Sequence, residues 1–307
     1  MTADAPELAL AAGDARVVLA PATGGAIAEF TFRECPVLRQ TSPEARAADD
    51  VLLHACYPLV PYSNRIARAT VRVGARDCAL TPNFGDSPHS IHGVGWQRAW
   101  SVAAASGTDA EIVLRHDPAA GGPGAWPFAF RARQSFSLSG TAGQAELVAT
   151  LAIENADDVA FPCGLGFHPF FPRSAGTTLG FRAGGVFDND PSLLPVAHVP
   201  IDEARRFDPP RRLAETALDH VFSGWAGRAT LEQPDAGIVV ELSAPPPATF
   251  LVVYVPQGGD FLAVEPVTHM TDAFNRAARG ESGTGTRVLE PGATLSCTMH
   301  IDVRTLA

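Results

Sequence analysis

The 307-residue sequence is poor in the features that mark several common protein classes. Its cysteines are few, odd in number and outside any CxxC arrangement: Cys35, Cys56, Cys78, Cys163 and Cys297. This pattern argues against a disulfide framework or a zinc ribbon and predicts a reducing compartment. Basic side chains are also scarce, with 23 Lys and Arg against 33 Asp and Glu and a net charge of −10. We therefore expect no nucleic-acid partner, because such partners select clustered Lys and Arg.

Membrane and targeting signals are missing as well. No apolar segment approaches the length needed to span a bilayer. The N-terminal residues MTADAPELALAAGDARVVLA carry acids where a signal peptide has a positive region. We expect a cytoplasmic protein with no membrane partner. The chain also lacks a GxSxG elbow, a Gly-rich phosphate loop and a dinucleotide fingerprint, which removes several enzyme classes.

The sequence does contain many short segments of alternating apolar and polar residues. Two of them, Phe128 to Ser137 and Ala145 to Glu154, alternate strictly and predict half-buried antiparallel strands. The 28 Gly and 26 Pro suit a protein rich in turns. Only Asp272 to Arg279 predicts a fair helix, with Ser42 to Asp50 a helical turn or a loop. With no fixed repeat or low-complexity linker, we expect one domain over residues 1–307, an all-β, large antiparallel sandwich with few short helices.

A single carboxylate, Glu265, has an unusual predicted environment. Phe250 to Val255 and Phe261 to Val264 read as two apolar strands, and Glu265 follows the second of them, directly before Pro266. Glu rarely enters apolar surroundings without a partner or a task, because desolvating its charge is costly. Glu265 is therefore the first candidate for a catalytic base. The alternative is a Glu at a strand end that points to water.

Four loop segments carry further polar residues in apolar company: Asn64 and Arg65, His92, His168, and Asp219. Each has a structural alternative, such as a hydrogen-bonded histidine, a surface ion pair or a turn cap. His89 and His92 could also suggest metal ligands, but their Pro- and Gly-rich context offers no third ligand, so we expect no metal. Trp96 is a candidate stacking platform for a sugar or a core residue. A sandwich can bring such loops together in one pocket.

Taken together, these residues resemble the aldose 1-epimerase (mutarotase) family. The resemblance rests on five motifs in the same order: PYSNRI at 61–66, IHGVGW at 91–96, GFHPFF at 166–171, LD at 218–219, and VEP at 264–266 with AFN at 273–275. The chain departs from the family pattern at Phe170, where many relatives have an aromatic hydroxyl, and at Met270-Thr271. These departures leave the sugar preference open.

The resemblance implies a galactose mutarotase-like supersandwich that interconverts the α and β anomers of a free aldose such as glucose or galactose. It implies that Glu265 is the general base, that His168 is the general acid, and that His92 lies near the ring oxygen. It further implies that Arg65 and Asp219 hold sugar hydroxyls, with Asn64 a weaker binding candidate. Only protons move in this reaction, so we expect no cofactor. The expected partner is the small-molecule sugar, and the protein is expected to be a monomer or a homodimer.

Three other functions remain as alternatives. A hexose-6-phosphate 1-epimerase on the same fold would need a cluster of Arg or Lys for the phosphate, and only Arg65 is clearly placed near the predicted site. A non-catalytic sugar-binding protein would not need the acid–base pair that this chain keeps. A glycosidase would use Asp219 and Glu265 as a carboxylate pair.

Overall fold

The computed structural model describes residues 6–122 and 124–306, and it is built almost entirely from antiparallel strands. The largest sheet runs in the order β10-β11-β12-β13-β27-β23-β22-β17-β20. Its strands are β10 (Ser101–Ala105), β11 (Asp109–His116), β12 (Phe130–Gly140), β13 (Gln144–Asn155), β17 (Thr178–Phe181), β20 (Arg211–Arg212), β22 (Arg228–Gln233), β23 (Ile238–Ser243) and β27 (Thr294–Thr305). The expected all-β class with few short helices is confirmed.

A second large sheet has the order β19-β18-β21-β24-β25-β15-β5, and β16 also pairs with β25. Its strands are β5 (Pro58–Leu59), β15 (Gly166–Phe167), β16 (Phe170–Pro172), β18 (Gly185–Asn189), β19 (Pro195–Val199), β21 (Leu218–Ser223), β24 (Phe250–Val255) and β25 (Phe261–Val267). We call this the site sheet, because both predicted carboxylates, Asp219 and Glu265, lie in it.

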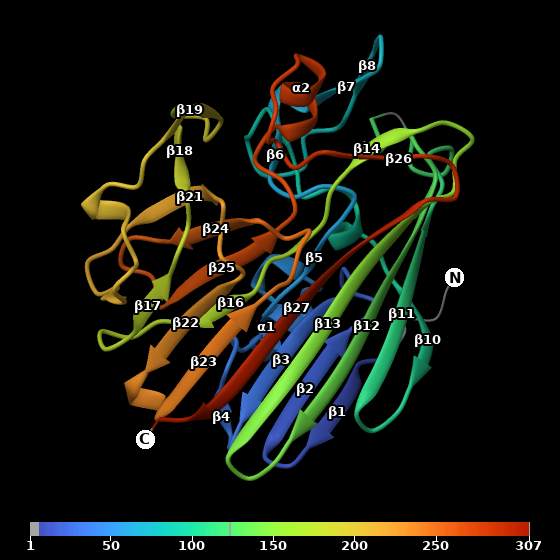
Figure 1. The fold of residues 1–307 in the computed structure, drawn as a ribbon. Helices are drawn as coiled ribbons and strands as arrows, with labels where there is room; N and C mark the ends of the chain where they lie inside the picture. Colours follow the sequence, from blue (N-terminus) through green and yellow to red (C-terminus); the bar gives the residue numbers. More distant parts are fainter. Residues whose placement is uncertain (1–5, 123, 307) are drawn as a thin grey trace.

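The remaining strands form one four-stranded sheet and three two-stranded ladders. The four-stranded sheet contains β1 (Leu8–Ala12), β2 (Ala15–Ala20), β3 (Ala26–Phe32) and β4 (Cys35–Pro36). The ladders are β6 (Arg65–Ile66) with β9 (Ser90–Ile91), β7 (Thr70–Val73) with β8 (Arg76–Ala79), and β14 (Phe161–Cys163) with β26 (Arg287–Leu289). In Figure 1, the long strands β11, β12, β13 and β27 lie across the blue strands β1–β3, as two layers of a sandwich.

Helical structure is short and confined to connections. The helices are α1 (Pro43–Ala47), α2 (Ala273–Ala278) and the 3-10 turns η1 (Val51–Leu53), η2 (Ala67–Ala69), η3 (Gly95–Gln97), η4 (Glu203–Arg205) and η5 (Pro234–Ala236). The Ser42 side chain caps α1 by accepting the Ala45 N–H. The two predictions of helix are therefore confirmed. None of the helices in the described ranges is long and apolar enough to cross a membrane.

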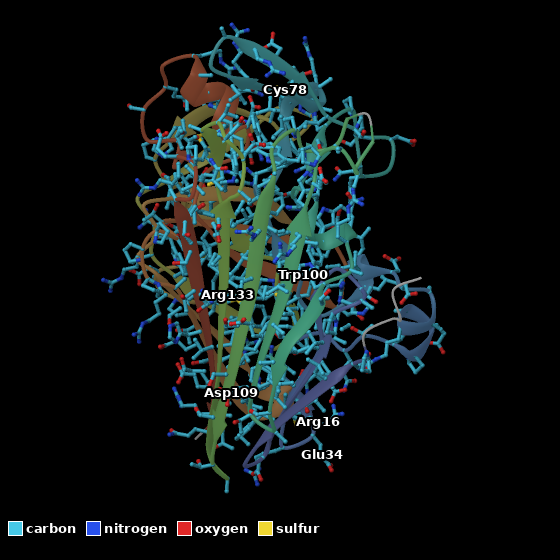
Figure 2. All side chains as sticks on the ribbon, turned by 90° about the vertical axis from the view of Figure 1, so that its right-hand side faces the viewer. Arg16, Glu34, Cys78, Trp100, Asp109 and Arg133 are labelled. Atoms are coloured by element: carbon cyan, nitrogen blue, oxygen red, sulfur yellow. The ribbon has the colours of Figure 1, made fainter. Side chains whose placement is uncertain are left out.

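Alternation along the long strands explains where the core lies. In β27, Cys297, Met299, Ile301 and Val303 are buried, while the residues between them face outward. One cluster of buried apolar side chains extends from Leu10 in β1 to Val303 in β27. Figure 2 shows the long sheet from its side, with Trp100, only 1% exposed, among the strands and Arg16 and Glu34 at the lower rim.

The structure differs from the sequence-based expectation in the three polar loops. The loops expected to carry Asn64 and Arg65, His92, and His168 each include or adjoin strands of two or three residues. These strands are too short to show any apolar periodicity, so alternation along the chain cannot reveal them. Arg65 lies in such a strand, whereas Asn64, His92 and His168 lie directly beside one.

Candidate active site

Glu265 lies inside a strand and not at its end, which corrects the expectation from sequence. Strand β25 continues through Pro266 to Val267. The N–H groups of Val264 and Thr268 point toward the 165–169 segment, where they bond the carbonyls of Pro169 and Leu165. Pro266 falls between these two positions, so its missing N–H faces the interruption between β15 and β16 and removes no ladder bond to β24. The proline is therefore compatible with a central strand.

The register of the site sheet places the two carboxylates on one face. Glu265 pairs with Val252 of β24, and Asp219 of β21 pairs with Tyr254 of β24. Val252 and Tyr254 are two residues apart and therefore point to the same side. Asp219 was expected in a loop, but it lies in β21, where its burial is partial. Strand pairing thus brings together two residues that are 46 positions apart in the sequence.

His168 reaches Glu265 from a neighbouring segment. Its Nε2 lies 3.2 Å from Glu265 Oε1, and the two side chains are 10% and 3% exposed. The backbone N–H of His168 donates to the Tyr57 carbonyl at 3.0 Å, and Tyr57 packs its ring 4.7 Å from the imidazole. The second carboxylate oxygen, Glu265 Oε2, is buried and has no hydrogen-bond partner in the described part of the chain. This oxygen is free to accept a proton from a bound hydroxyl.

Burial acts on both members of this pair in the same sense, toward the neutral form. It raises the pKa of Glu265 well above its ordinary value; Asp219 adds to this effect, and Arg65 opposes it. Burial also lowers the pKa of His168 to about 3, and the Arg39 guanidinium acts in the same direction. Both shifts disfavour the charged pair in the unliganded protein, although Nε2 and Oε1 lie in hydrogen-bond contact. A proton can pass between these two atoms without any change in the net charge of the pair.

His92 is a neutral hydrogen-bond donor. Its Nδ1 accepts the backbone N–H of Asn64 at 3.0 Å, so the ring proton must reside on Nε2. Burial and the neighbouring His168 lower its pKa well below the ordinary range. The two imidazole rings meet edge to face with centroids 5.2 Å apart. His92 therefore offers a fixed N–H beside the His168–Glu265 pair.

Arg65 is positioned by Asn64 and by helix α2. Asn64 adopts a left-handed backbone conformation, with φ of 56°, and its Oδ1 accepts from both the Arg65 backbone N–H and Nη1. The Arg65 carbonyl accepts from the N–H of Asp272, whose side chain accepts from Ala67 N at 3.0 Å. Burial raises the pKa of Asp219, and the charge of Arg65 opposes this rise. The predicted binding residues are therefore electrostatically coupled.

The chain matches the sequence model of the aldose 1-epimerase family over residues 6–302. The chain belongs to the aldose 1-epimerase family. The Escherichia coli K12 protein named uncharacterized protein YphB is 28% identical over 291 residues, covering 92% of this chain and 94% of that protein. A second E. coli K12 protein, uncharacterized protein YihR, is 28% identical over 93% of this chain and 89% of its own.

Solved structures of this family share the fold. A candidate aldose 1-epimerase from E. coli K12 superposes with a TM-score of 0.86 at 26% identity, covering 98% of this chain and 99% of the other. A galactose mutarotase-like protein from Clostridium acetobutylicum gives a TM-score of 0.83 at 17% identity, covering 97% and 95%. The expected galactose mutarotase-like fold is therefore confirmed.

Several residues around the epimerase-family site escaped the sequence analysis. Tyr57 contacts His168, His92 and Trp96 with its ring. Arg39 lies 3.9 Å over the Phe170 ring, at the position where this chain departs from many relatives. His269 accepts the Ser63 N–H through Nε2 and bonds the Met270 carbonyl through Nδ1. Tyr57, Arg39 and His269 lie outside the motifs at 61–66, 166–171 and 264–266. Their contacts with the site depend on the tertiary structure, so no signal in the sequence identified them.

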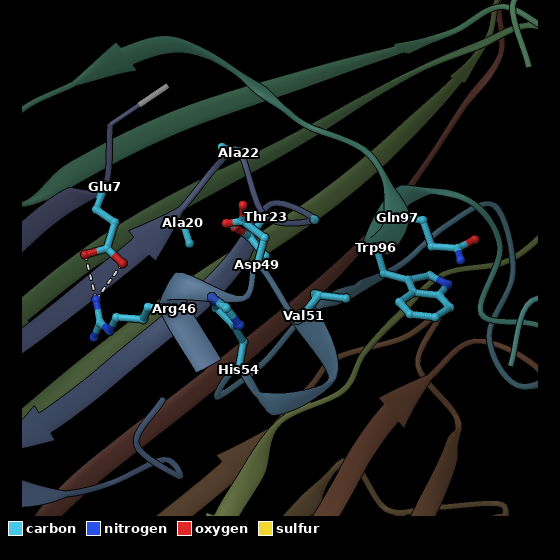
Figure 3. A pocket seen from close by; sticks show the side chains of 11 residues that line it. Glu7, Ala20, Ala22, Thr23, Arg46, Asp49, Val51, His54, Trp96 and Gln97 are labelled. Atoms are coloured by element: carbon cyan, nitrogen blue, oxygen red, sulfur yellow. Dashed lines mark hydrogen bonds and ion pairs between the residues drawn. The ribbon is translucent and has the colours of Figure 1, made fainter. Parts of the chain in front are cut away.

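Trp96 lies in the core and not on an open sugar-binding surface. It is 4% exposed and stacks on Tyr57 with ring centroids 5.9 Å apart. It also borders a separate cavity of about 360 Å³, shown in Figure 3, where Arg46 pairs with Glu7. None of the six predicted site residues lines that cavity. His89 and His92 each use Nδ1 to accept a backbone N–H, and no His, Cys, Asp or Glu cluster in residues 6–122 and 124–306 could hold a metal ion.

Proposed function

We propose that this protein is an aldose 1-epimerase that interconverts the α and β anomers of a free aldose such as glucose or galactose. The observation that carries the proposal is the buried contact of 3.2 Å between His168 Nε2 and Glu265 Oε1. Anomer exchange needs one group that accepts a proton and another that donates one, both within reach of the same sugar. This pair supplies both functions next to a neutral donor, His92.

The reaction can be written with these residues in named roles. Glu265 removes the proton of the C1 hydroxyl, and the O–H electron pair becomes the second bond of the C1 carbonyl. The bond between C1 and the ring oxygen breaks, and His168 delivers a proton to that oxygen. Rotation about the C1–C2 bond presents the other carbonyl face, and the reverse proton transfers close the ring. One proton enters the pair at Glu265 and one leaves it from His168, so the proton count of the pair is unchanged by ring opening, and no step requires a cofactor.

His92 and Arg65 are suited to support the same chemistry. The fixed Nε2–H of His92 is suited to donate to the ring oxygen as negative charge develops there. Arg65 lies close enough to Glu265 to oppose the rise in the carboxyl pKa, which favours the ionised base when a sugar is bound. Asn64 is a positioning residue that acts through Arg65. Asp219 and Arg65 would accept from and donate to sugar hydroxyls.

A free sugar fits the charges better than a phosphosugar. Arg65 shares its surroundings with Asp219, and the Nη2 atom of Arg39 is already bonded to the carbonyls of Leu52 and His54 at 2.7 Å. A phosphate would select an open fork of several cations. A sugar-binding protein without activity would have no need for a buried Glu and His in direct contact.

Polarimetry on freshly dissolved α-D-glucose and α-D-galactose tests the proposal. We expect the wild type to accelerate the decay of rotation, and we expect Glu265→Gln and His168→Asn to lose it by about a hundredfold or more, while circular dichroism shows both variants folded. Near-full turnover in either variant would remove that residue from its role. Activity on glucose 6-phosphate alone would favour the phosphosugar reaction instead.

A further inference from the structure

Two buried polar atoms at the Arg65–Asp219 end of the site lack a partner. They are Nε2 of His89 and Oδ1 of Asn189, neither of which has a hydrogen-bond partner in the described ranges. His89 is only 3% exposed. A buried polar atom without a partner is costly and uncommon in folded proteins, so each instance calls for an explanation. A ligand that bonds both atoms would provide one.

The contacts of His89 determine what its free atom can do. The Arg68 backbone N–H donates to His89 Nδ1 at 2.9 Å, so the neutral ring carries its hydrogen on Nε2. Burial lowers the pKa of His89, and the charge of Arg65 lowers it further. The imidazole therefore lies within electrostatic reach of Arg65. Asp190 acts on the same ring in the opposite direction. His89 therefore presents an N–H donor near Arg65 and Asp190.

Asn189 presents the complementary group. Its Nδ2 donates to the Asp219 carbonyl at 3.0 Å, so its buried Oδ1 is left as an acceptor. Strand β18 pairs with β21 at Gly185–Ser223 and Val186–Phe222, and beyond a bulge at Asp188 the Nδ2 bond holds Asn189 against Asp219. Its chain neighbour is Asp190, one of the groups that act on His89. The Asn189 acceptor therefore lies beside Asp219, one residue from a carboxylate that acts on the His89 ring.

We propose that His89 and Asn189 determine specificity by binding the sugar hydroxyl on C4, the carbon opposite the anomeric carbon. This inference rests on the proposed function, which orients C1 toward Glu265 and His168. β18 and β25 are separated by three strand spacings of about 4.8 Å each. That separation is long enough to be spanned by one pyranose ring with a hydrogen bond at each end. A hydroxyl both donates and accepts, so it satisfies the two atoms together.

The groups at this end favour a neutral ligand. Asp219, Asp190 and the Asn189 oxygen present acceptor atoms to a phosphate or carboxylate, and the Arg65 cation is shared with Asp219. An uncharged hydroxyl can donate a hydrogen bond to such acceptors. The pair should therefore discriminate sugars by the presence and orientation of this hydroxyl, since glucose and galactose differ at that carbon.

Matched substitutions at His89 separate this role from a structural one. His89→Asn keeps an acceptor near the position of Nδ1, for the Arg68 N–H, and deletes the Nε2 donor. His89→Gln keeps a donor near the position of Nε2 and weakens the loop bond. Asn189→Leu removes the acceptor. Kinetics are measured by polarimetry with the preferred hexose, its C4 epimer and its 4-deoxy analogue, and thermal melts report folding.

We expect wild-type kcat/KM to be about tenfold lower for the 4-deoxy analogue than for the parent hexose. His89→Asn and Asn189→Leu should lower kcat/KM for the parent about tenfold, mainly through KM, and leave the analogue nearly unchanged. His89→Gln should retain most of the discrimination. Equal losses on both sugars in all variants, or no loss in any, would overturn the assignment.

A binding measurement separates failure of this inference from failure of the proposed function. If the wild type accelerates none of the sugars, the proposed reaction is wrong, and calorimetric titration of wild type and His89→Asn with the same panel decides the subsite alone. The subsite is supported if the wild type binds a hexose more tightly than its 4-deoxy analogue and His89→Asn shows no such difference. Equal binding of the two, or binding of neither, would overturn it.

Discussion

At the residue scale, the site depends on how burial distributes protons among Glu265, His168 and His92. Ordinary pKa values would give an ionised Glu and a mostly neutral His at neutral pH. Burial disfavours every charged form in the unliganded protein: it raises the pKa of Glu265 and lowers the pKa values of His168 and His92. A bound sugar hydroxyl that contacts the pair is therefore expected to take part in distributing the proton.

The pH dependence of activity should reflect this arrangement. Burial lowers the pKa of His168 to about 3, so the ring should not titrate near the ordinary histidine value. We therefore expect kcat/KM to stay high as pH falls from 7 to about 4. Polarimetry across this range, corrected for uncatalysed mutarotation and paired with circular dichroism, measures it. A half-loss of kcat/KM near pH 6.5 in folded protein would contradict the lowered pKa of His168.

At the scale of elements, short strands and strained turns hold the site residues in place. Asn64, His92 and Asp272 all have positive φ values, between 54° and 60°, although none is glycine. Such conformations persist only where surrounding hydrogen bonds impose them, and they are often found at functional sites. Here the N–H of His92 bonds the Asn64 carbonyl, and the N–H of Asp272 bonds the Arg65 carbonyl.

Substitution of Gly93 tests whether the backbone conformation next to His92 is needed for stability and activity. Gly93 has φ of +71°, and a Cβ at this position would lie 2.1 Å from the Val60 carbonyl oxygen. We expect Gly93→Ala to lower the free energy of unfolding by at least about 2 kcal/mol and to reduce activity, because His92 must move with its neighbour. Thermal melts and polarimetry measure both effects.

Gly74 provides the matched control for that substitution. It has a similar φ of +58°, but a Cβ there meets no atom within 4 Å. Gly74→Ala should therefore show only the backbone strain, about 1 kcal/mol, with activity unchanged. Equal losses of stability in the two variants would show that the close approach at Val60 is unimportant.

At the scale of the whole molecule, the buried histidines link stability to pH. His92 and His269 are both 6% exposed or less, and their pKa values are lowered by burial, to about 4 in His269. Their ring nitrogens accept backbone N–H groups, and His269 also bonds the Met270 carbonyl. Both rings are therefore neutral in the folded protein at pH 5, whereas the unfolded chain would protonate them below about 6.5.

These histidines make the folded protein less stable as pH falls. Below pH 6.5 the unfolded state binds protons that the folded state cannot, so stability falls as pH falls. Each such histidine contributes a slope of about 1.4 kcal/mol per pH unit. We expect Tm to decrease between pH 7 and pH 5, and we expect His269→Asn to show a shallower decrease, whatever its starting Tm. Burial raises the pKa values of Glu265 and Asp219, which act in the opposite direction, so the comparison of the two proteins is decisive. An equal decrease of Tm in wild type and His269→Asn would contradict the neutral assignment of His269.

The sequence by itself determined the fold class, the family and the six candidate residues. Alternation at period two is a local property, so strict patterns such as 128–137 and 145–154 predicted strands β12 and β13 directly. Glu265, His168 and Arg65 each lie within a short contiguous motif, so the sequence alone identifies them as candidates. Their roles in catalysis and binding remain proposals.

Tertiary structure alone decided which residues meet and which protonation states result. The pairing of β21, β24 and β25 brings Asp219 to the face of Glu265, and the unpartnered atoms of His89 and Asn189 appear only once their neighbours are in place. Strand register and burial depend on contacts between residues far apart in the chain, which no local pattern encodes. The shifted pKa values of Glu265 and His168 have the same origin, because desolvation is a property of the packed surroundings.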